Sequence, residues 1–553
     1  MGTALRRPRG WRRSRCATDA AFESRTQRGY TVVMKPLQTL PATPPTDDDL
    51  HTCIRVLRAI EADRAHLNRL TQEQRRELLT FAGLITKPER HDIAKMAKAF
   101  RRAKRAAVKE HDRQVLDQAG LRVQRRAPVY APLWLERPKP SGHADPGDPD
   151  ESGDRAELRR QRACYVCKQP FAKIHRYYDS MCDTCGDFNY AKREQTADLT
   201  GHYALVTGAR VKIGFQASLK LLRAGAHVIV TTRFPVDAAH RYSQESDFAH
   251  FCHRLQIHGL DLRHTPSVEI FTRFLTERLP RLDYIVNNAC QTVRRPAGFF
   301  HHLLARETGS TAALPAAWAG PLAQHSELLR TLGRSQAGDG GMTVAAPVGG
   351  GGEGLLHSAS LSQRRYLDEG LHGEALFPTD RYDEDRQQVD LRAINSWRLR
   401  LHEVETPELL EVHLVNAIAP YILNARLKPL MLRTPERHKH VVNVSAMEGQ
   451  FYRIAKTDKH PHTNMAKAAL NMMTRTSAID FVKDGIHMNA VDTGWVTDED
   501  PVAHAARKTD LGFSPPLDII DGAARIVDPL FAGHLTGTHL WGQFLKDYKP
   551  APW

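Results

Sequence analysis

Residues 201–233, GHYALVTGARVKIGFQASLKLLRAGAHVIVTTR, decide the fold class of this chain. They contain a short apolar run at 203–206, a glycine turn, a helical stretch that ends near Gly225, and a second apolar run at 227–232. This strand–turn–helix–strand order places helix N-terminal amides at the turn, where they meet a pyrophosphate. Gly208 and Gly214 are a weak signal alone, but in this context they predict a nucleotide-binding Rossmann domain.

Six motifs, in order along the chain, resemble those of the short-chain dehydrogenase/reductase (SDR) family. They are TGARVKIG at 207–214, NNAC at 287–290, VNAIAP at 415–420, VVNVSAMEG at 441–449, NMAKAAL at 464–470 and NAVDTGWVT at 489–497. The resemblance implies an α/β fold with a doubly wound parallel sheet, in a first part at 199–301 and a second part at 406–553. Residues 302–405 are rich in glycine and other small residues, and we expect a largely flexible insertion with some local helix.

Two basic residues indicate which nucleotide the Rossmann domain binds. In this fold, an acidic residue at the end of the second strand binds the ribose of NAD, whereas arginine accommodates the 2′-phosphate of NADP. Arg233 occupies that position, and Lys212 replaces the middle glycine of the family's turn, similar to the pteridine reductases. We therefore expect NADP(H) in preference to NAD(H). The expected cofactor-binding residues are Gly208, Arg210, Lys212, Ile213, Gly214 and Arg233 at the phosphates, Asp261 and Asn287 at the adenosine part, Ala289 of the NNAC motif, and Lys467 at the nicotinamide ribose.

The catalytic residues that the resemblance implies are only partly present. Family members use a tyrosine as acid or base, a lysine four residues later, and a serine that binds the substrate. Lys467 matches the lysine, but Thr463 and Ala446 stand at the tyrosine and serine positions, with Ser445 one residue early. Threonine is no substitute, because an alcohol is a far weaker acid than a phenol of pKa about 10.

Other side chains in the same region are candidates for the missing acid. Tyr452, His460 and His462 lie in an extended loop, and His460 stands seven residues before Lys467, the spacing that enoyl reductases use for their tyrosine. Asn416 and Lys467 complete the expected catalytic set. Two functions remain open: an SDR oxidoreductase acting on an unknown small carbonyl or alcohol, and an NADP(H)-binding pseudoenzyme that serves as a protein or RNA adaptor or sensor.

Four cysteines form the second chemical motif, C-x2-C-x14-C-x2-C, within a zinc-ribbon-like module at 161–198. Two CxxC turns complete a tetrahedron around zinc, and four sulfur ligands leave no open coordination position, so we expect a structural site. A redox pair or free thiols are the alternative, and His175 is a candidate to replace one sulfur. The expected metal ligands are Cys164, Cys167, Cys182 and Cys185.

The remaining N-terminal sequence is basic, and the whole chain of 553 residues has a formal net charge of +15. We expect a disordered or targeting segment at 1–46, a basic helical region at 47–136 and a linker at 137–160. The basic helices form a solvated face or contact RNA or an acidic protein. No apolar run reaches the 18 residues of a membrane span, so we expect a soluble protein. The cytoplasm is the expected location, with organellar import through the Arg-rich N-terminus as the alternative, and a homo-oligomer is one expected assembly.

Overall fold

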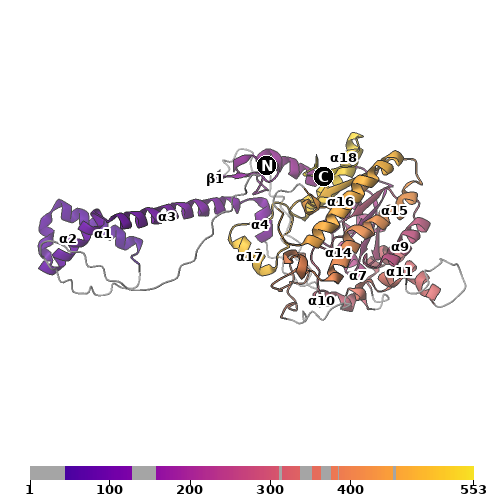
Figure 1. Ribbon diagram of the computed structural model, residues 1–553, viewed down its shortest axis with the longest axis horizontal. Helices are drawn as coiled ribbons and strands as arrows, with labels where there is room; N and C mark the ends of the chain where they lie inside the picture. The colour runs from indigo at the N-terminus through magenta and orange to yellow at the C-terminus, as the bar shows by residue number, and fades with distance from the viewer. Residues whose placement is uncertain are drawn as a thin grey trace, which may run out of the picture. The chain divides into compact units, whose positions relative to one another are not determined.

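The computed structural model describes residues 44–126, 157–309, 314–336, 351–362, 375–383, 385–451, 456–497 and 499–553. It divides into two compact units, Met1–Phe100 and Arg101–Trp553 (Figure 1). Within the described residues, no helix has the length and apolar character needed to cross a bilayer.

The first unit is helical. It contains α1 (Asp47–Ala62), η1 (Arg64–Arg69), α2 (Gln72–Thr86) and the start of α3 (Arg90–Leu116). Capping boxes begin α1 and α2, where Thr46 pairs with Asp49 and Thr71 pairs with Gln74. Because no residue of α1, η1 or α2 is buried, local capping supports these helices more than core packing does.

The second unit is built on an eight-stranded sheet, counted over the described residues, with the order β10-β9-β8-β7-β6-β3-β4-β5. All neighbouring strands run parallel except the terminal pair β9 and β10. The strands are β3 (Tyr203–Thr207), β4 (His227–Thr232), β5 (Leu255–Gly259), β6 (Tyr284–Asn287), β7 (Lys439–Ser445), β8 (Ile486–Asp492), β9 (Phe544–Lys546) and β10 (Lys549–Ala551).

Alternate residues of the central strands enter two apolar layers. Val206 packs with α6 (Lys212–Arg223), α7 (Pro235–Ser243) and α18 (Ile519–Thr536), whereas Leu205 packs with α9 (Thr265–Arg278) and α15 (Ala419–Met431). Helix α16 (Pro461–Phe481) joins the second layer. Because strands buried on both faces read as continuous apolar runs, this arrangement confirms the prediction of a doubly wound α/β sheet.

The other short elements connect or cover these layers. They are α8 (Phe248–Phe251), η2 (Cys252–Arg254), α10 (Ala297–Glu307), α11 (Ala316–Gln336), α12 (Glu353–Leu356), α13 (Ser358–Leu361), η4 (Ser396–Arg398), η5 (Leu401–Glu403), α14 (Thr406–His413), η6 (Leu414–Ile418), η7 (Met447–Gly449), η8 (Val482–Asp484) and α17 (Val502–Asp510). The described part of segment 302–405 is packed: α11 contacts β5 and α7, and Trp318 donates to Ser243 Oγ at 3.0 Å.

The four-cysteine module lies in the second unit. It comprises β1 (Glu157–Ala163), β2 (Pro170–Lys173) and α5 (Asp183–Glu194), preceded by α4 (Gly120–Arg126). Strand β1 pairs antiparallel with β2 and begins at Glu157, so residues 157–160 form a strand where the sequence suggested linker. The composition of 137–155 resembles a linker, but the strand partner of 157–163 lies beyond the first CxxC motif and gives no local signal.

Candidate cofactor and metal sites

The turn between β3 and α6 packs closely against the segment that follows β6. Gly208 has φ +67°, and a Cβ there would lie 2.7 Å from Ala289 Cα. A Cβ on Gly214 would overlap Asn288 Nδ2 and the Gly208 carbonyl. Both positions therefore require glycine, and the first turn of α6 borders a cavity of about 1570 Å³.

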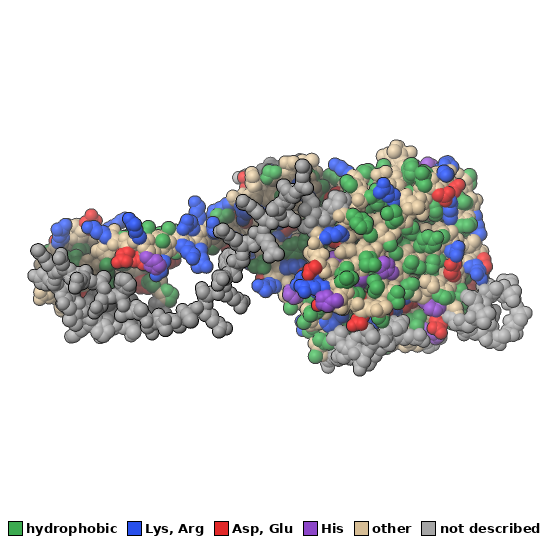
Figure 2. All heavy atoms as spheres, in the orientation of Figure 1, with side chains coloured by type: hydrophobic (Ala, Val, Ile, Leu, Met, Phe, Trp, Pro, Cys, Tyr) green, Lys and Arg blue, Asp and Glu red, His purple; other side chains and the backbone are tan. Residues whose placement is uncertain are grey.

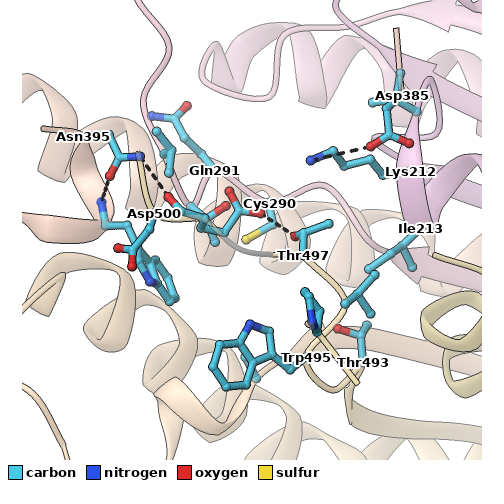
Figure 3. Close-up of a pocket in the computed structure, with 18 of the residues that line it drawn as sticks. Lys212, Ile213, Cys290, Gln291, Asp385, Asn395, Thr493, Trp495, Thr497 and Asp500 are labelled. Carbon is cyan, nitrogen blue, oxygen red and sulfur yellow. Dashed lines mark hydrogen bonds and ion pairs between the residues drawn. The ribbon is translucent and has the colours of Figure 1, made fainter. Parts of the chain in front are cut away.

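Lys212 takes the place of the family's middle glycine with φ +56°, a conformation that glycine adopts without strain. Its Nζ lies 3.8 Å from Asp385 Oδ2, which comes from the segment 302–405 (Figure 3). Burial lowers the pKa of Lys212, but Glu499 and Asp385 together raise it more, so its pKa stands above the ordinary value. The lysine is held charged beside the turn.

Arg210 borders the cavity, but its guanidinium already has protein partners. It lies 2.7 Å from Asp237 Oδ2 and donates to Gln387 Oε1 at 3.2 Å. The sequence assigned Arg210 to a cofactor phosphate. In the structure it joins the turn to α7 and to the inserted segment and supplies the counter-charge of the buried Asp237 carboxylate, so its contact with a phosphate stays a prediction.

Arg233, at the end of β4, differs from Arg210 in its surroundings. Its guanidinium lies over the rings of Phe300 and Phe234, with centroid distances of 4.6 and 5.6 Å. Among the described residues no carboxylate or hydrogen-bond acceptor contacts that guanidinium, and the side chain lines the cavity. Burial, followed by the neighbouring charge of Arg263, lowers the pKa of Arg233 to about 10. Arg233 is thus a half-buried cation with no counter-ion in the part of the chain that the structure describes.

The three residues predicted for the adenosine region have different environments. Asp261 lines the cavity, but its carboxylate accepts hydrogen bonds from Arg263 at 2.6 to 3.1 Å. Ala289 also lines the cavity and donates its N–H to Thr207 Oγ1. Asn287 does not line it: its amide donates to Asn424 and Asn443 in a buried polar cluster. Its side chain joins β6 to its neighbours, and its assignment to the adenosine part stays a prediction.

Lys467 and Asn416 differ in their relation to the cavity. Lys467 lines the cavity and donates to the Val444 carbonyl at 2.7 Å. Asn416 lies in the π-helical turn η6, and its amide exchanges hydrogen bonds with the backbone of Gln291. Asn416 thus positions a cavity-lining segment instead of facing the cavity itself. Ser445 lines the cavity and donates to Asn471 Oδ1 at 2.6 Å.

The candidate acids are separated by the structure. His460 lines the cavity and stacks on Trp397 with ring centroids 3.9 Å apart. His462 is buried away from the cavity, with Nε2 3.4 Å from Glu408 Oε1. Thr463 is also buried outside it, and its hydroxyl has no partner among the described residues. Tyr452 lies outside the described residues. Only His460 of the two histidines is therefore in place to meet a ligand.

Burial lowers the pKa of His460 below its usual range, although Glu448 opposes this effect. His460 is also the N-cap residue of α16 with φ +41°, and its backbone N–H donates to the Leu399 carbonyl at 2.7 Å. The inserted segment therefore makes two contacts with His460: a backbone hydrogen bond at Leu399 and ring stacking at Trp397. In the sequence, Trp397 stands out only as a tryptophan in a polar stretch. That signal does not reveal that it stacks on His460.

The four predicted metal ligands come together at one point. The sulfur atoms of Cys164, Cys167, Cys182 and Cys185 all lie within 4.8 Å of one another. This confirms that the two CxxC turns form one cluster, with the donor set and spacing that zinc prefers. Burial raises the pKa of Cys164, but backbone N–H groups of Cys182 and Cys167 lower it more, to about 7.

His175 supports the cluster without competing for the metal. Its Nδ1 accepts hydrogen bonds from the N–H groups of Tyr177 and Tyr178, and its Nε2 lies 3.1 Å from Asp187 Oδ1. Since both ring nitrogens have partners, His175 is not the fourth ligand. A Cβ on Gly186 would overlap the His175 ring, so glycine at this position allows α5 to begin against the histidine.

Comparisons with known proteins agree with this architecture. The family profile described as "short chain dehydrogenase" matches residues 202–313, and that described as "Enoyl-(Acyl carrier protein) reductase" matches residues 392–510. An uncharacterized protein, R665, of Acanthamoeba polyphaga mimivirus is 30% identical over 396 residues, which are 70% of this chain and 74% of that protein. The chain therefore belongs to the SDR family of NAD(P)-binding oxidoreductases.

More distant matches cover less or are less similar. The (-)-isopiperitenone reductase of Mentha piperita is 36% identical over 90 residues, 16% of this chain and 28% of that enzyme. The solved Pseudomonas aeruginosa RhlG/NADP active-site complex is 17% identical, with a TM-score of 0.38, over 63% of this chain and 95% of that one.

Proposed function

We propose that this chain binds NADP(H) in the cavity and uses it in the reduction or oxidation of a small carbonyl or alcohol. The observation that carries the proposal is Arg233, a half-buried guanidinium at the end of β4 that has no counter-ion among the described residues. A buried charge is costly unless it is paired. The 2′-phosphate that distinguishes NADP(H) from NAD(H) supplies that partner at this position.

The rest of the cavity fits the same cofactor. Gly208 and Gly214 line the cavity at the start of α6, where helix N-terminal amides bind a pyrophosphate, and the charged Lys212 lies beside them. Lys467 lines the same cavity, as do His460 and Asn464. When bound, NADPH supplies a hydride to the substrate carbon, and the chain has to supply the proton.

We assign proton transfer to His460. Its ring lines the cavity, and stacking on Trp397 fixes the ring plane. Its Nδ1 is buried and has no hydrogen-bond partner among the described residues, and imidazole is an effective proton donor near neutral pH. Lys467, on the next turns of the same helix, lies in the same lining and binds the cofactor ribose in this proposal.

A binding measurement tests the cofactor assignment. NADPH and NADH are titrated into the purified full chain and followed by nucleotide fluorescence. We expect NADPH to bind more tightly, and Arg233→Asp to weaken NADPH binding by about 10- to 100-fold through loss of a charge-assisted contact. Arg330→Asp, on the exposed side of α11, is the matched control and leaves the affinity unchanged. An unchanged preference in Arg233→Asp contradicts the assignment.

A second function is favoured by the missing catalytic groups. Thr463 is buried outside the cavity and Ala446 occupies the serine position, so the chain would bind NADP(H) without turnover and act as an adaptor or sensor. Tight NADPH binding, with no NADPH oxidation in the presence of carbonyl, pterin or enone substrates, supports this second function. Measurable turnover that is lost in His460→Ala supports the first.

We also propose zinc as the occupant of the four-cysteine cluster. The cluster offers four sulfur donors and no fifth protein ligand among the described residues. Such closed sites stabilise a fold and do not activate water.

A further inference from the structure

The first CxxC turn of the metal cluster forms part of the cofactor cavity. Tyr165 and Lys168, one inside and one just after the Cys164–Cys167 pair, line the same cavity as Gly208 and Arg233. The turn is closed by a hydrogen bond from Lys168 N to the Cys164 carbonyl, and Tyr165 N donates to the Ser180 carbonyl. The position of Tyr165 is therefore set by the backbone that carries two of the metal ligands.

Tyr165 contacts the loop that follows β8. Its hydroxyl accepts a hydrogen bond from Trp495 N at 3.0 Å. Gly494 has φ +77°, and a Cβ there would lie 3.1 Å from the Tyr165 hydroxyl and 2.5 Å from Leu517 Cδ1. The backbone conformation at Gly494 therefore requires glycine, and the Tyr165 hydroxyl contacts one side of the loop.

A lysine makes a second connection at the same place. Lys546 Nζ, on β9, lies 3.0 Å from Asp492 Oδ2 at the end of β8. The same Nζ lies 5.6 Å from the centre of the Tyr165 ring. Asp492 and Lys546 line the cavity. Tyr165 thus lies next to an ion pair at the start of the loop.

An apolar cluster extends this contact to the phosphate turn. Val496 of the loop and Ile213 of the glycine turn pack in one cluster with Cys164, Tyr165 and Val166. Figure 3 shows Ile213, Thr493 and Trp495 on the same side of the cavity, away from the Lys212–Asp385 pair. A displacement of the CxxC turn would therefore affect both the loop 492–497 and the glycine turn through the packing of this cluster.

The module is also attached to the Rossmann domain by contacts that involve none of the four cysteines. Tyr178 donates to Asp521 Oδ1 at 2.5 Å, and Arg193 lies 2.7 Å from Asp518 Oδ1 on α18. We therefore expect loss of the metal to release the CxxC turn before these contacts to α18 are lost.

We propose that zinc in the four-cysteine site holds Tyr165 against the loop 492–497, so that zinc loading and NADPH binding strengthen each other. The proposal rests on the NADP(H) function proposed above. Tyr165 acts as a positioning residue, since it shapes the cavity wall through Trp495. Because coupling between two binding sites is reciprocal, NADPH must also slow the release of zinc.

The test uses the full chain with zinc and after zinc removal by a chelator. NADPH affinity is measured by fluorescence, and zinc release is followed with a metal-binding dye; circular dichroism checks that the chain stays folded. We expect NADPH affinity to fall by roughly fivefold or more on zinc removal, and NADPH to slow zinc release. Equal NADPH affinity with and without zinc overturns the proposal.

Two variants that each remove one tyrosine hydroxyl distinguish the role of Tyr165 from general effects on the four-cysteine module. Tyr165→Phe should retain zinc but bind NADPH at least about threefold more weakly, because it lacks the bond to Trp495. Tyr177→Phe, which removes hydroxyl bonds to Gln124 and Asp518 outside the cavity, should retain both. The same loss in both variants, or in neither, overturns the role of Tyr165. If zinc-loaded protein binds no NADPH at all, the proposed function fails instead.

Discussion

The stacked pair of His460 and Trp397 gives the proposed reaction a defined pH dependence. Burial lowers the pKa of His460 below 6.5, so at neutral pH most molecules carry the neutral ring. Only the protonated ring donates a proton to a carbonyl oxygen. We therefore expect kcat for NADPH oxidation to rise as the pH falls from 8 and to level off below the His460 pKa. Stopped-flow or steady-state absorbance at several pH values measures this profile.

Two histidine variants decide whether His460 is responsible. His460→Ala should lower kcat by about 100-fold or more and flatten the profile. His462→Ala removes the neighbouring histidine, which is buried against Glu408 and does not line the cavity, so the shape of the profile should persist. A wild-type profile in His460→Ala assigns the proton to another group.

At the same scale, the sequence could identify site residues only where a local motif specifies them. The glycine turn and the four cysteines are local motifs, and their geometry follows from short spacings. The pairing of Arg210 with Asp237 is different, because it depends on where α7 lies in three dimensions. Asn287 shows the same limit: its partner Asn443 is on a neighbouring strand that is distant in sequence. Motif matching cannot reveal which charges and amides the fold has already paired.

At the scale of elements, the sequence predicted the βαβ unit closely. The second strand was expected at 227–232, and β4 is His227–Thr232. The inserted segment was harder to predict, because composition rich in glycine does not reveal which of its residues contact the core. Asp385 and Trp397 reach the glycine turn and the start of α16 through contacts that link distant parts of the chain.

The four-cysteine element makes a prediction about zinc content. The wild-type chain should contain about one zinc, and Cys182→Ser should lose most of it because three sulfurs no longer close the tetrahedron. The apparent unfolding temperature should fall with it. Elemental analysis and calorimetry measure both. Cys53→Ser, at an exposed position of α1, is the matched control and keeps full zinc. Full zinc in Cys182→Ser would show that the cluster binds no zinc through that sulfur.

At the scale of the whole second unit, a group of histidines at the amino ends of the strands limits stability in acid. His440 and His438 both hydrogen-bond to His539, at 2.9 and 2.7 Å. His534 hydrogen-bonds to Tyr284 at 2.5 Å. Burial lowers the pKa of His534 and of His539 to about 4, with help from neighbouring histidines, and lowers that of His440 well below 6.5.

The sign of the resulting pH dependence is fixed by these directions. The folded pKa values lie below the unfolded value of about 6.5, so the unfolded chain binds more protons as the pH falls. Stability should therefore decrease from about pH 6.5 towards pH 4, with the apparent unfolding temperature about 5 °C or more lower at pH 5 than at pH 7. His539→Asn should reduce this difference, whereas His504→Asn, on the exposed side of α17, should not. An equal difference in all three proteins would place the acid sensitivity elsewhere.

An apolar face over α15 and α16 predicts how whole molecules associate. Figure 2 shows hydrophobic side chains gathered on the side of the second unit where these helices lie. Met465, Met472 and Ile479 are 52%, 59% and 61% exposed, and their spacing of seven residues puts them along one side of α16. Tyr421 on α15 is 60% exposed as well. An apolar stripe of this extent is typical of a surface that pairs with a second copy by twofold symmetry.

We therefore expect the chain to form dimers at micromolar concentration, as measured by sedimentation velocity. Met472→Glu should weaken the dimer by about tenfold or more, because the charge would be desolvated at the centre of the contact. Leu535→Glu, at a residue of α18 that is 60% exposed, is the matched control for adding a charge at an exposed apolar site. A monomeric wild-type chain, or equal weakening by both substitutions, would mean that the α16 stripe serves another purpose. Because Lys467 lies on the same helix and lines the cavity, a dimer formed through α16 would also restrain the helix that carries this proposed cofactor-binding residue.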